Sequence, residues 1–358
     1  MSESSLIIDS CVHPFFAKEM DLRDWIPSEF KTRGWPKIER PWYQAPGGEY
    51  REDLYEDGFP ERGSYPASDP DLTARHVLDQ PGAAYAILHP LSRGNLPDRL
   101  LNSAICAATN DWLADCWLKN PVANGRFLGT IRVNPDDPAG AVEEIERWSS
   151  HPQMVQIGVP LQSRDLYGKP QYEAIWEAAA GAGLPVAVHL AGGAGIESPP
   201  TPAGHVTNYP HYASYVPLNY MHHLMSLIGD GMFSRHPNLV FIFCDGGADI
   251  VTPFLWRMDT FWRGLRDHEP WVDQSPSSYL ADHVRFCFSG QEGPPSDIAG
   301  EWMAQMGKED ILLYASNYPY WSTVEAGELP MGLQEEQRRK ILGLNAELVY
   351  NLGGRIPA

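Results

Sequence analysis

The sequence predicts a (β/α)₈ barrel, the TIM-barrel fold, in which eight parallel strands alternate with helices. Three observations predict it: eight short apolar runs recur along the 358 residues, helical patterns separate them, and polar side chains follow most of the runs. Runs that are apolar almost without a break are typical of parallel strands covered on both faces. An open doubly wound sheet is the alternative, but no G-x-G-x-x-G pattern follows the first run.

The expected strands are the eight apolar runs themselves. They are Leu6–Asp9, Ala84–His89, Phe127–Val133, Met154–Val159, Pro185–Leu190, Leu239–Cys244, Val284–Ser289 and Ile311–Ala315. Helices are expected after residues 97–98, 137–138, 169–170 and 294–295, and over 246–266 and about 334–352. Proline near a helix start and glycine after its end support these boundaries.

Residues 14–68 break this alternation and are rich in Trp, Tyr, Pro, Gly and charged residues. The aromatic content argues against disorder. We expect a single domain over residues 1–358, with 14–68 as an insertion that forms a lid over the barrel mouth. The alternative is a decoration packed on the flank. A second loop, residues 191–216, is also expected at the mouth.

Composition limits the classes of partner. The formal net charge is −19, which disfavours nucleic acid and anionic membrane surfaces. Five cysteines without a C-x-x-C pair indicate reduced, mostly buried thiols in a cytoplasmic protein. The N-terminal residues do not resemble a signal peptide, and no apolar run is long enough to span a membrane.

The ends of the expected strands carry the chemistry, because in such barrels the active site lies at the carboxyl ends. Cys11 and His13 are two residues apart on an extended segment, so both side chains point to one side and can chelate a metal. His189 ends the fifth strand and can supply a third ligand. Thiolate and imidazole both suit zinc. A buried filler thiol and hydrogen-bonded structural histidines are the alternatives. Adjacent histidines at 222 and 223 point about 100° apart on a helix and cannot share one metal.

The sequence resembles the amidohydrolase-related family, in the branch that contains aminocarboxymuconate-semialdehyde decarboxylase. The resemblance runs from residue 5 to about 352, apart from 14–68. The stretches that carry it are IIDSCVHP, GTIRVNPDDPAGAVEEIERW, YEAIWEAAAGAGLPVAVHLAGG, LIGDGMFSRHPNLVFIFCDGGADIVTPFLWRMD, ILLYASNYPYW and ILGLNAELVYNL.

This resemblance implies roles for individual positions. The family usually opens with Asp-x-His-x-His, and the two histidine positions that bind metal are Cys11 and His13 here. His189 matches the metal-binding histidine of the fifth strand. Asp245 stands at the position that acts as acid or base, and Asn317 replaces the usual aspartate of Ser-Asp-Tyr-Pro. We therefore predict Cys11, His13 and His189 as metal ligands and Asp245, His189 and Asn317 as catalytic residues.

The change to Asn317 affects the expected mechanism, because an amide cannot take a proton from water and is a weaker ligand than a carboxylate. Asp245 is the replacement base. Zinc is the expected metal, with iron and manganese as alternatives. The other hypothesis is a site without metal, in which Cys11, His13 and His189 bind substrate directly.

Three functions follow. The first is a metal-dependent hydrolase that cleaves an ester, lactone, amide or thioester bond. The second is a non-oxidative decarboxylase of an aromatic or unsaturated acid, and the third is a binding protein without catalysis. The aromatic insertion suggests a bulky aromatic or polycyclic small molecule, and the resemblance suggests a homodimer.

Several residues are predicted to contact the substrate. They are Arg132, His205, His211, Tyr318 and Trp321. Arg132 ends the third strand and can bind a carboxylate, although Arg51 and Arg93 are alternatives. Tyr318 and Trp321 either line the pocket or pack under its rim.

Overall fold

The computed structural model describes residues 6–17, 21–32, 44–45, 48–49, 65–91, 96–190, 204, 206–244, 246–290, 292–320, 329–330 and 332–353. Its main sheet has eight parallel strands in the order β1-β4-β5-β6-β7-β8-β9-β10. Their bounds are β1 Ile8–Val12, β4 Tyr85–Leu88, β5 Phe127–Arg132, β6 Met154–Pro160, β7 Val186–His189, β8 Phe241–Phe243, β9 Val284–Phe288 and β10 Leu312–Tyr314. All eight expected strands are present, and the predicted barrel is confirmed.

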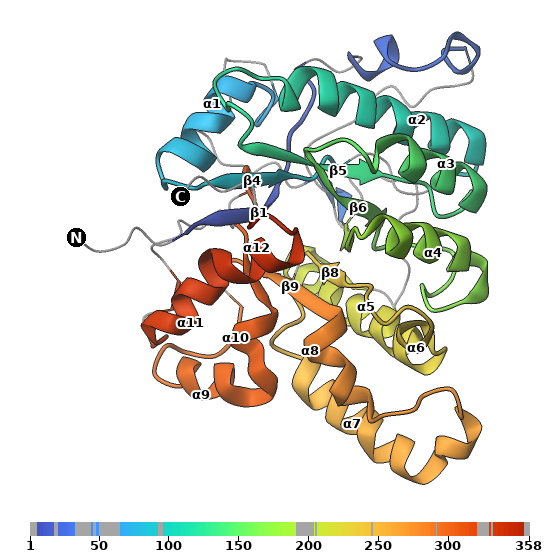
Figure 1. Ribbon diagram of the computed structural model, residues 1–358, viewed down its shortest axis with the longest axis vertical. Helices are drawn as coiled ribbons and strands as arrows, with labels where there is room; N and C mark the ends of the chain where they lie inside the picture. The colour runs from blue at the N-terminus through green and yellow to red at the C-terminus, as the bar shows by residue number, and fades with distance from the viewer. Residues whose placement is uncertain are drawn as a thin grey trace.

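Helices surround the strands (Figure 1). They are α1 Pro70–Ala74, α2 Arg99–Trp112, α3 Pro138–Trp148, α4 Glu173–Ala182, α5 Tyr209–Gly229, α6 Met232–Arg235, α7 Val251–Leu265, α8 Leu280–His283, α9 Ala299–Ala304, α10 Lys308–Ile311, α11 Glu335–Arg339 and α12 Asn345–Val349. A short antiparallel pair, β2 Gln44–Ala45 and β3 Gly48–Glu49, lies within the predicted insertion. None of the helices in the described ranges is long and apolar enough to cross a membrane.

Local sequence sets where these helices begin and end. The side chain of Asp98 accepts a hydrogen bond from the Leu101 amide at the start of α2, and Asp137 does the same for Gly140 in α3. Gly183 ends α4 in the left-handed conformation, with φ 66°.

The helix expected over residues 246–266 begins later, at Val251. Gly246 and Gly247 have φ angles of 90° and 107°, so they form a turn between β8 and the helix. The later start places Pro253 in the first turn, where its missing N–H interrupts no helical hydrogen bond.

Side chains alternate between the inside of the barrel and the layer under the helices. In β5, for example, Phe127 and Ile131 pack under the helices, whereas Leu128 belongs to the interior cluster. The interior is apolar near the amino ends of the strands, where Ile8 and Leu313 are fully buried. Tyr350, which follows α12, is buried in this cluster, and its hydroxyl donates to Gln156 Oε1 at 3.1 Å. The interior is therefore packed, and space for chemistry is left to the carboxyl ends.

The two ends of the sheet are joined beyond their strands. The Asp9 carboxylate Oδ1 accepts from the Ser316 amide at 3.0 Å, and the His13 amide donates to the Tyr318 carbonyl at 2.9 Å. These bonds fix the segment after β10 beside the end of β1, so residues 305 and 307 positions apart in the chain share one rim.

The first part of the predicted insertion packs against α2. Phe16 contacts the ring of Trp112, with ring centroids 4.4 Å apart, and Leu22 and Ile26 are buried. The role of 14–68 as a lid stays a prediction, because most of the aromatic residues of this segment lie outside the described ranges.

Candidate functional site

Polar side chains occupy the inward positions at the carboxyl ends of the strands. In β5 the alternation that places Leu128 inside the barrel also turns Thr130 and Arg132 inward, and in β7 it turns His189 inward after Ala187. All of these side chains are at most 1% exposed. Each strand therefore passes from apolar to polar along one line of side chains.

A register irregularity sets the direction of the first strand. Ile8 faces the interior, and strict alternation would turn Cys11 and His13 away from it. The pairing between β1 and β4 shifts between Asp9 and Val12, which changes the phase of the strand. As a result Cys11 and His13 point inward together.

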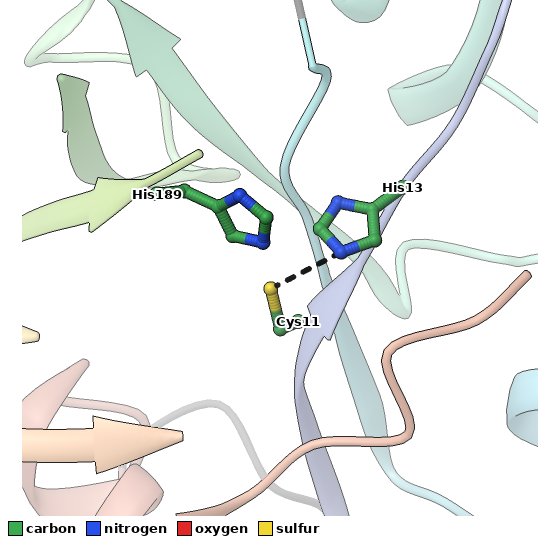
Figure 2. A group of neighbouring side chains, drawn as sticks. All are labelled: Cys11, His13 and His189. Atoms are coloured by element: carbon green, nitrogen blue, oxygen red, sulfur yellow. Dashed lines mark hydrogen bonds between the residues drawn. The ribbon is translucent and has the colours of Figure 1, made fainter. Parts of the chain in front are cut away.

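Cys11, His13 and His189 meet at this end of the barrel, as Figure 2 shows, and together they form a cluster of potential metal ligands. Their ligand atoms lie within 4.8 Å of one another, and all three residues are buried. The Cys11 thiol lies 3.6 Å from His13 Nε2, and the rings of His13 and His189 are 4.6 Å apart between centroids. The predicted convergence of these residues is present in the structure.

Backbone carbonyls orient both imidazoles. His13 Nδ1 lies 3.0 Å from the His89 carbonyl oxygen, and His189 Nδ1 lies 2.9 Å from the Leu190 carbonyl oxygen. Each Nδ1–H donates to its carbonyl, which leaves the Nε2 lone pair directed toward the cluster. Metal-bound histidines are usually held in this way. Burial lowers the pKa of His189 to about 3, so its ring is neutral, as a ligand must be.

Asn317 adds an oxygen to the cluster. Its side-chain Oδ1 lies 2.7 Å from His13 Nε2. The residue has a φ of 58°, a left-handed conformation that asparagine adopts more readily than most side chains. Together the four residues present one sulfur, two nitrogens and one oxygen, a donor set that fits a zinc-like or first-row divalent cation.

A protein-family model described as amidohydrolase matches residues 8–352 of the chain. The chain belongs to the amidohydrolase family. The match covers every strand of the barrel and all four residues of the cluster.

Solved structures with similar folds include three that are named as decarboxylases. The 2,6-dihydroxybenzoate decarboxylase from Rhizobium is 20% identical, and the match covers 98% of this chain and 99% of that chain, with a TM-score of 0.69. A 5-carboxyvanillate decarboxylase from Novosphingobium aromaticivorans, with bound manganese and 4-hydroxy-3-methoxy-5-nitrobenzoic acid, is 20% identical over 98% and 97% of the two chains, with a TM-score of 0.69. A dihydroxybenzoic acid decarboxylase from Polaromonas with manganese and 2-nitroresorcinol is 19% identical over 98% of both chains, with a TM-score of 0.67. At these identities the likeness establishes the fold.

Arg132 lies beside the cluster, as predicted from its position at a strand end. Its Nη1 donates to His89 Nε2 at 3.0 Å, and the His89 ring lies 5.0 Å from that of His189. Because a guanidinium only donates, His89 accepts with Nε2 and carries its proton on Nδ1. Burial lowers the pKa of His89 well below its usual value, so this histidine is neutral.

The other residues predicted to contact substrate lie elsewhere or outside the description. Tyr318 is buried, and its hydroxyl is hydrogen-bonded to His76 Nδ1 at 3.0 Å, so it packs under the rim. His211 is exposed in the first turn of α5. Asp245, His205 and Trp321 lie outside the described residues. The roles predicted for His211, Asp245, His205 and Trp321 stay predictions.

The sequence prediction missed two polar groups near the strand ends. His89 was expected only as the end of a strand, although its ring lies within 6.3 Å of His13 and next to His189. Glu292 follows β9, accepts from the amide and hydroxyl of Ser289, and packs beside Gly246. Burial raises the pKa of the Glu292 carboxyl. A charged residue four positions after the end of β9 was the available signal for Glu292.

Proposed function

We propose that this protein is a metal-dependent, non-oxidative decarboxylase of an aromatic or unsaturated carboxylic acid. The observation that carries the proposal is the buried set of Cys11, His13 and His189 with Arg132 directly beside it. A bound cation and a buried positive charge would both attract a small organic anion, such as a carboxylate substrate, into the site. Similar solved structures are named as decarboxylases of dihydroxybenzoates and of 5-carboxyvanillate, and two of them contain manganese.

Cys11 Sγ, His13 Nε2, His189 Nε2 and Asn317 Oδ1 would hold the cation. The two imidazoles are already fixed by their Nδ1 hydrogen bonds, so little rearrangement is needed on binding. When bound, such a cation polarises a substrate oxygen as a Lewis acid. The sulfur and nitrogen ligands favour zinc, whereas two of the similar structures hold manganese.

Arg132 and His89 would bind and orient the substrate. The Arg132 guanidinium is 1% exposed and keeps its positive charge, although burial lowers its pKa. It provides an attractive potential inside a chain of net charge −19, and guanidinium matches a carboxylate in shape. His89 Nδ1 is buried and has no hydrogen-bond partner among the described residues, so it can donate to a substrate oxygen.

Decarboxylation needs a proton for the carbon that loses carbon dioxide. Asp245 is the candidate from the sequence, and Glu292 is a candidate from the structure, because a buried carboxyl with a raised pKa retains its proton nearer neutral pH. Neither role depends on Asn317, whose amide cannot exchange a proton with water at neutral pH.

Hydrolysis of an ester, lactone, amide or thioester was the first expectation from the sequence. The similar solved structures described above are named as decarboxylases, which favours the second expectation instead. Replacement of the usual carboxylate by Asn317 also removes a base beside the cation.

The test is a substrate panel with two readouts. Zinc- or manganese-loaded protein is incubated with hydroxybenzoates that are labelled at the carboxyl carbon, and in parallel with aryl esters and lactones. We expect labelled carbon dioxide from at least one acid, no hydrolysis, and loss of product with His189→Ala. His268→Ala is the matched control, since it removes an exposed imidazole in the turn after α7 that has no predicted role in the site. Ester or lactone cleavage without carbon dioxide would reject the proposal in favour of a hydrolase.

A further inference from the structure

A second group of potential ligands lies inside the barrel and contains only sulfur. The thiols of Cys11, Cys244 and Cys287 lie within 4.8 Å of one another. All three are buried, with exposed fractions of 1%, 7% and 3%, and none of them forms a disulfide. They come from β1, from the residue after β8 and from β9, which are separate segments of the chain.

The fold brings these thiols together through the inward alternation of the strands. Cys244 lies two positions after the inward-facing Ile242 and therefore faces inward as well. Cys287 stands between Phe286 and Phe288, which both pack under the helices, so its side chain also points inward. Cys11 reaches the same layer because of the register shift in β1. The other two cysteines of the chain, Cys106 and Cys116, lie in α2 and in the helical turn after it. Three of five cysteines therefore converge at one level of the barrel.

The spacing fits a bound cation. Two thiolates held by zinc at about 2.3 Å in a tetrahedral arrangement lie about 3.8 Å apart. Sulfur atoms within 4.8 Å of one another need only small side-chain movements to reach this spacing. Thiolates are soft ligands, which select zinc or monovalent copper over manganese or magnesium.

We propose that Cys11, Cys244 and Cys287 form a site for a thiophilic d¹⁰ cation, Cu⁺ or Zn²⁺, inside the barrel. This site differs in chemistry from the group of Cys11, His13 and His189, but the two share one ligand. Because Cys11 belongs to both, occupation of the thiol site changes the charge and freedom of a ligand of the histidine site. The inference does not rest on the proposed reaction, since it concerns binding alone.

The test compares metal affinities of the full-length protein and its variants under anaerobic, reducing conditions. Cu⁺ affinity is measured by competition with a bathocuproine chelator and Zn²⁺ affinity with a chromophoric chelator, while charge-transfer absorption of added Co²⁺ reports thiolate ligands. In a His189→Ala background, which removes a ligand of the histidine group, Cys244→Ala and Cys287→Ala should each lower the affinity for Cu⁺ or Zn²⁺ by more than about 100-fold, beyond the 10–100-fold effect of residues that only support ligands. Cys106→Ala is the matched control, a buried thiol outside the group.

Two further measurements keep the outcome clear. Thermal unfolding without metal verifies that each variant folds, and Cys→Ser variants at the same positions replace any that does not. Mn²⁺ affinity should stay within about threefold in the Cys244 and Cys287 variants, because manganese prefers oxygen and nitrogen ligands. Equal Cu⁺ and Zn²⁺ affinities in the wild type and the double variant of Cys244 and Cys287, or no tight binding of either ion to the wild type, would overturn the proposal.

Discussion

Asn317 Oδ1 lies 2.7 Å from His13 Nε2, although the two residues are 304 positions apart in the chain. His13 already donates its Nδ1–H to the His89 carbonyl, so in the neutral ring Nε2 carries a lone pair. An amide oxygen only accepts, so either a proton on Nε2 or a cation between the two atoms is needed to hold them this close. We propose that the cation of the histidine group takes this place, with His13 Nε2 and Asn317 Oδ1 as two of its ligands.

Asn317→Asp should strengthen divalent metal binding by at least about tenfold, because a carboxylate oxygen carries the charge that an amide oxygen lacks. Aspartate also tolerates the left-handed backbone found at this position, so the fold should be retained. Calorimetric titration with Zn²⁺ and Mn²⁺ measures the change. Asn317→Gly, which removes the oxygen and also tolerates the left-handed backbone, should weaken binding. If both variants bind as the wild type does, Asn317 is not a ligand.

Gly158 in β6 leaves the space that Arg132 occupies. A Cβ atom at this position would lie 2.6 Å from Thr130 Cγ2 and 3.0 Å from Arg132 Nη1. Gly158→Ala should therefore displace the guanidinium and raise KM for an acid substrate by at least about tenfold, roughly the 1.4 kcal/mol of one weakened charged contact. Gly181→Ala in α4 is the control, because its Cβ meets nothing within 4 Å and should leave KM unchanged. An unaltered KM in Gly158→Ala argues against a role of Arg132 in binding.

Metal binding should also stabilise the fold, since the ligands come together only in the folded chain. At a metal concentration 100 times Kd the stabilisation is about 2.7 kcal/mol, which differential scanning calorimetry detects as a rise in Tm. His189→Ala should abolish most of this rise. His151→Ala, which changes a histidine at the amino end of β6 far from the cluster in sequence, should retain it. A rise of equal size in both variants would place the metal elsewhere.

The sequence was sufficient for the barrel and for the convergence of Cys11, His13 and His189, because parallel strands bring their ends to one rim whatever their separation in the chain. It was insufficient for Cys244 and Cys287, which were interpreted only as buried thiols. Their approach to Cys11 depends on a register shift in β1, and such a shift leaves no trace in a pattern of apolar residues.

The same limit applies to individual side-chain partners. Tyr318 follows the last strand next to Asn317, yet its hydroxyl bonds to His76 under the rim whereas Asn317 faces His13. Neighbouring residues in a turn point in different directions, and the direction follows from backbone angles such as the φ of 58° at Asn317. Position at a strand end therefore identifies candidate site residues, and the three-dimensional geometry then shows which of them face the metal ligands.

His223 in α5 should make the stability of the protein depend on pH. It is 3% exposed, its Nε2 lies 2.8 Å from the Leu161 carbonyl oxygen, and its Nδ1 accepts from the Tyr167 amide at 3.3 Å. Burial lowers its pKa from 6.5 to about 4. Between pH 6.5 and about pH 4 this histidine binds a proton in the unfolded chain but stays neutral in the folded protein. Its contribution to the free energy of unfolding is therefore fully present above pH 6.5 and decreases as the pH falls. The loss between pH 7 and pH 5 is about 2 kcal/mol.

Urea unfolding of His223→Gln should show a correspondingly flatter pH dependence, while His222→Gln, the less buried neighbour on the same helix, should behave as the wild type does. Parallel pH profiles for His223→Gln and the wild type would exclude this histidine as the source.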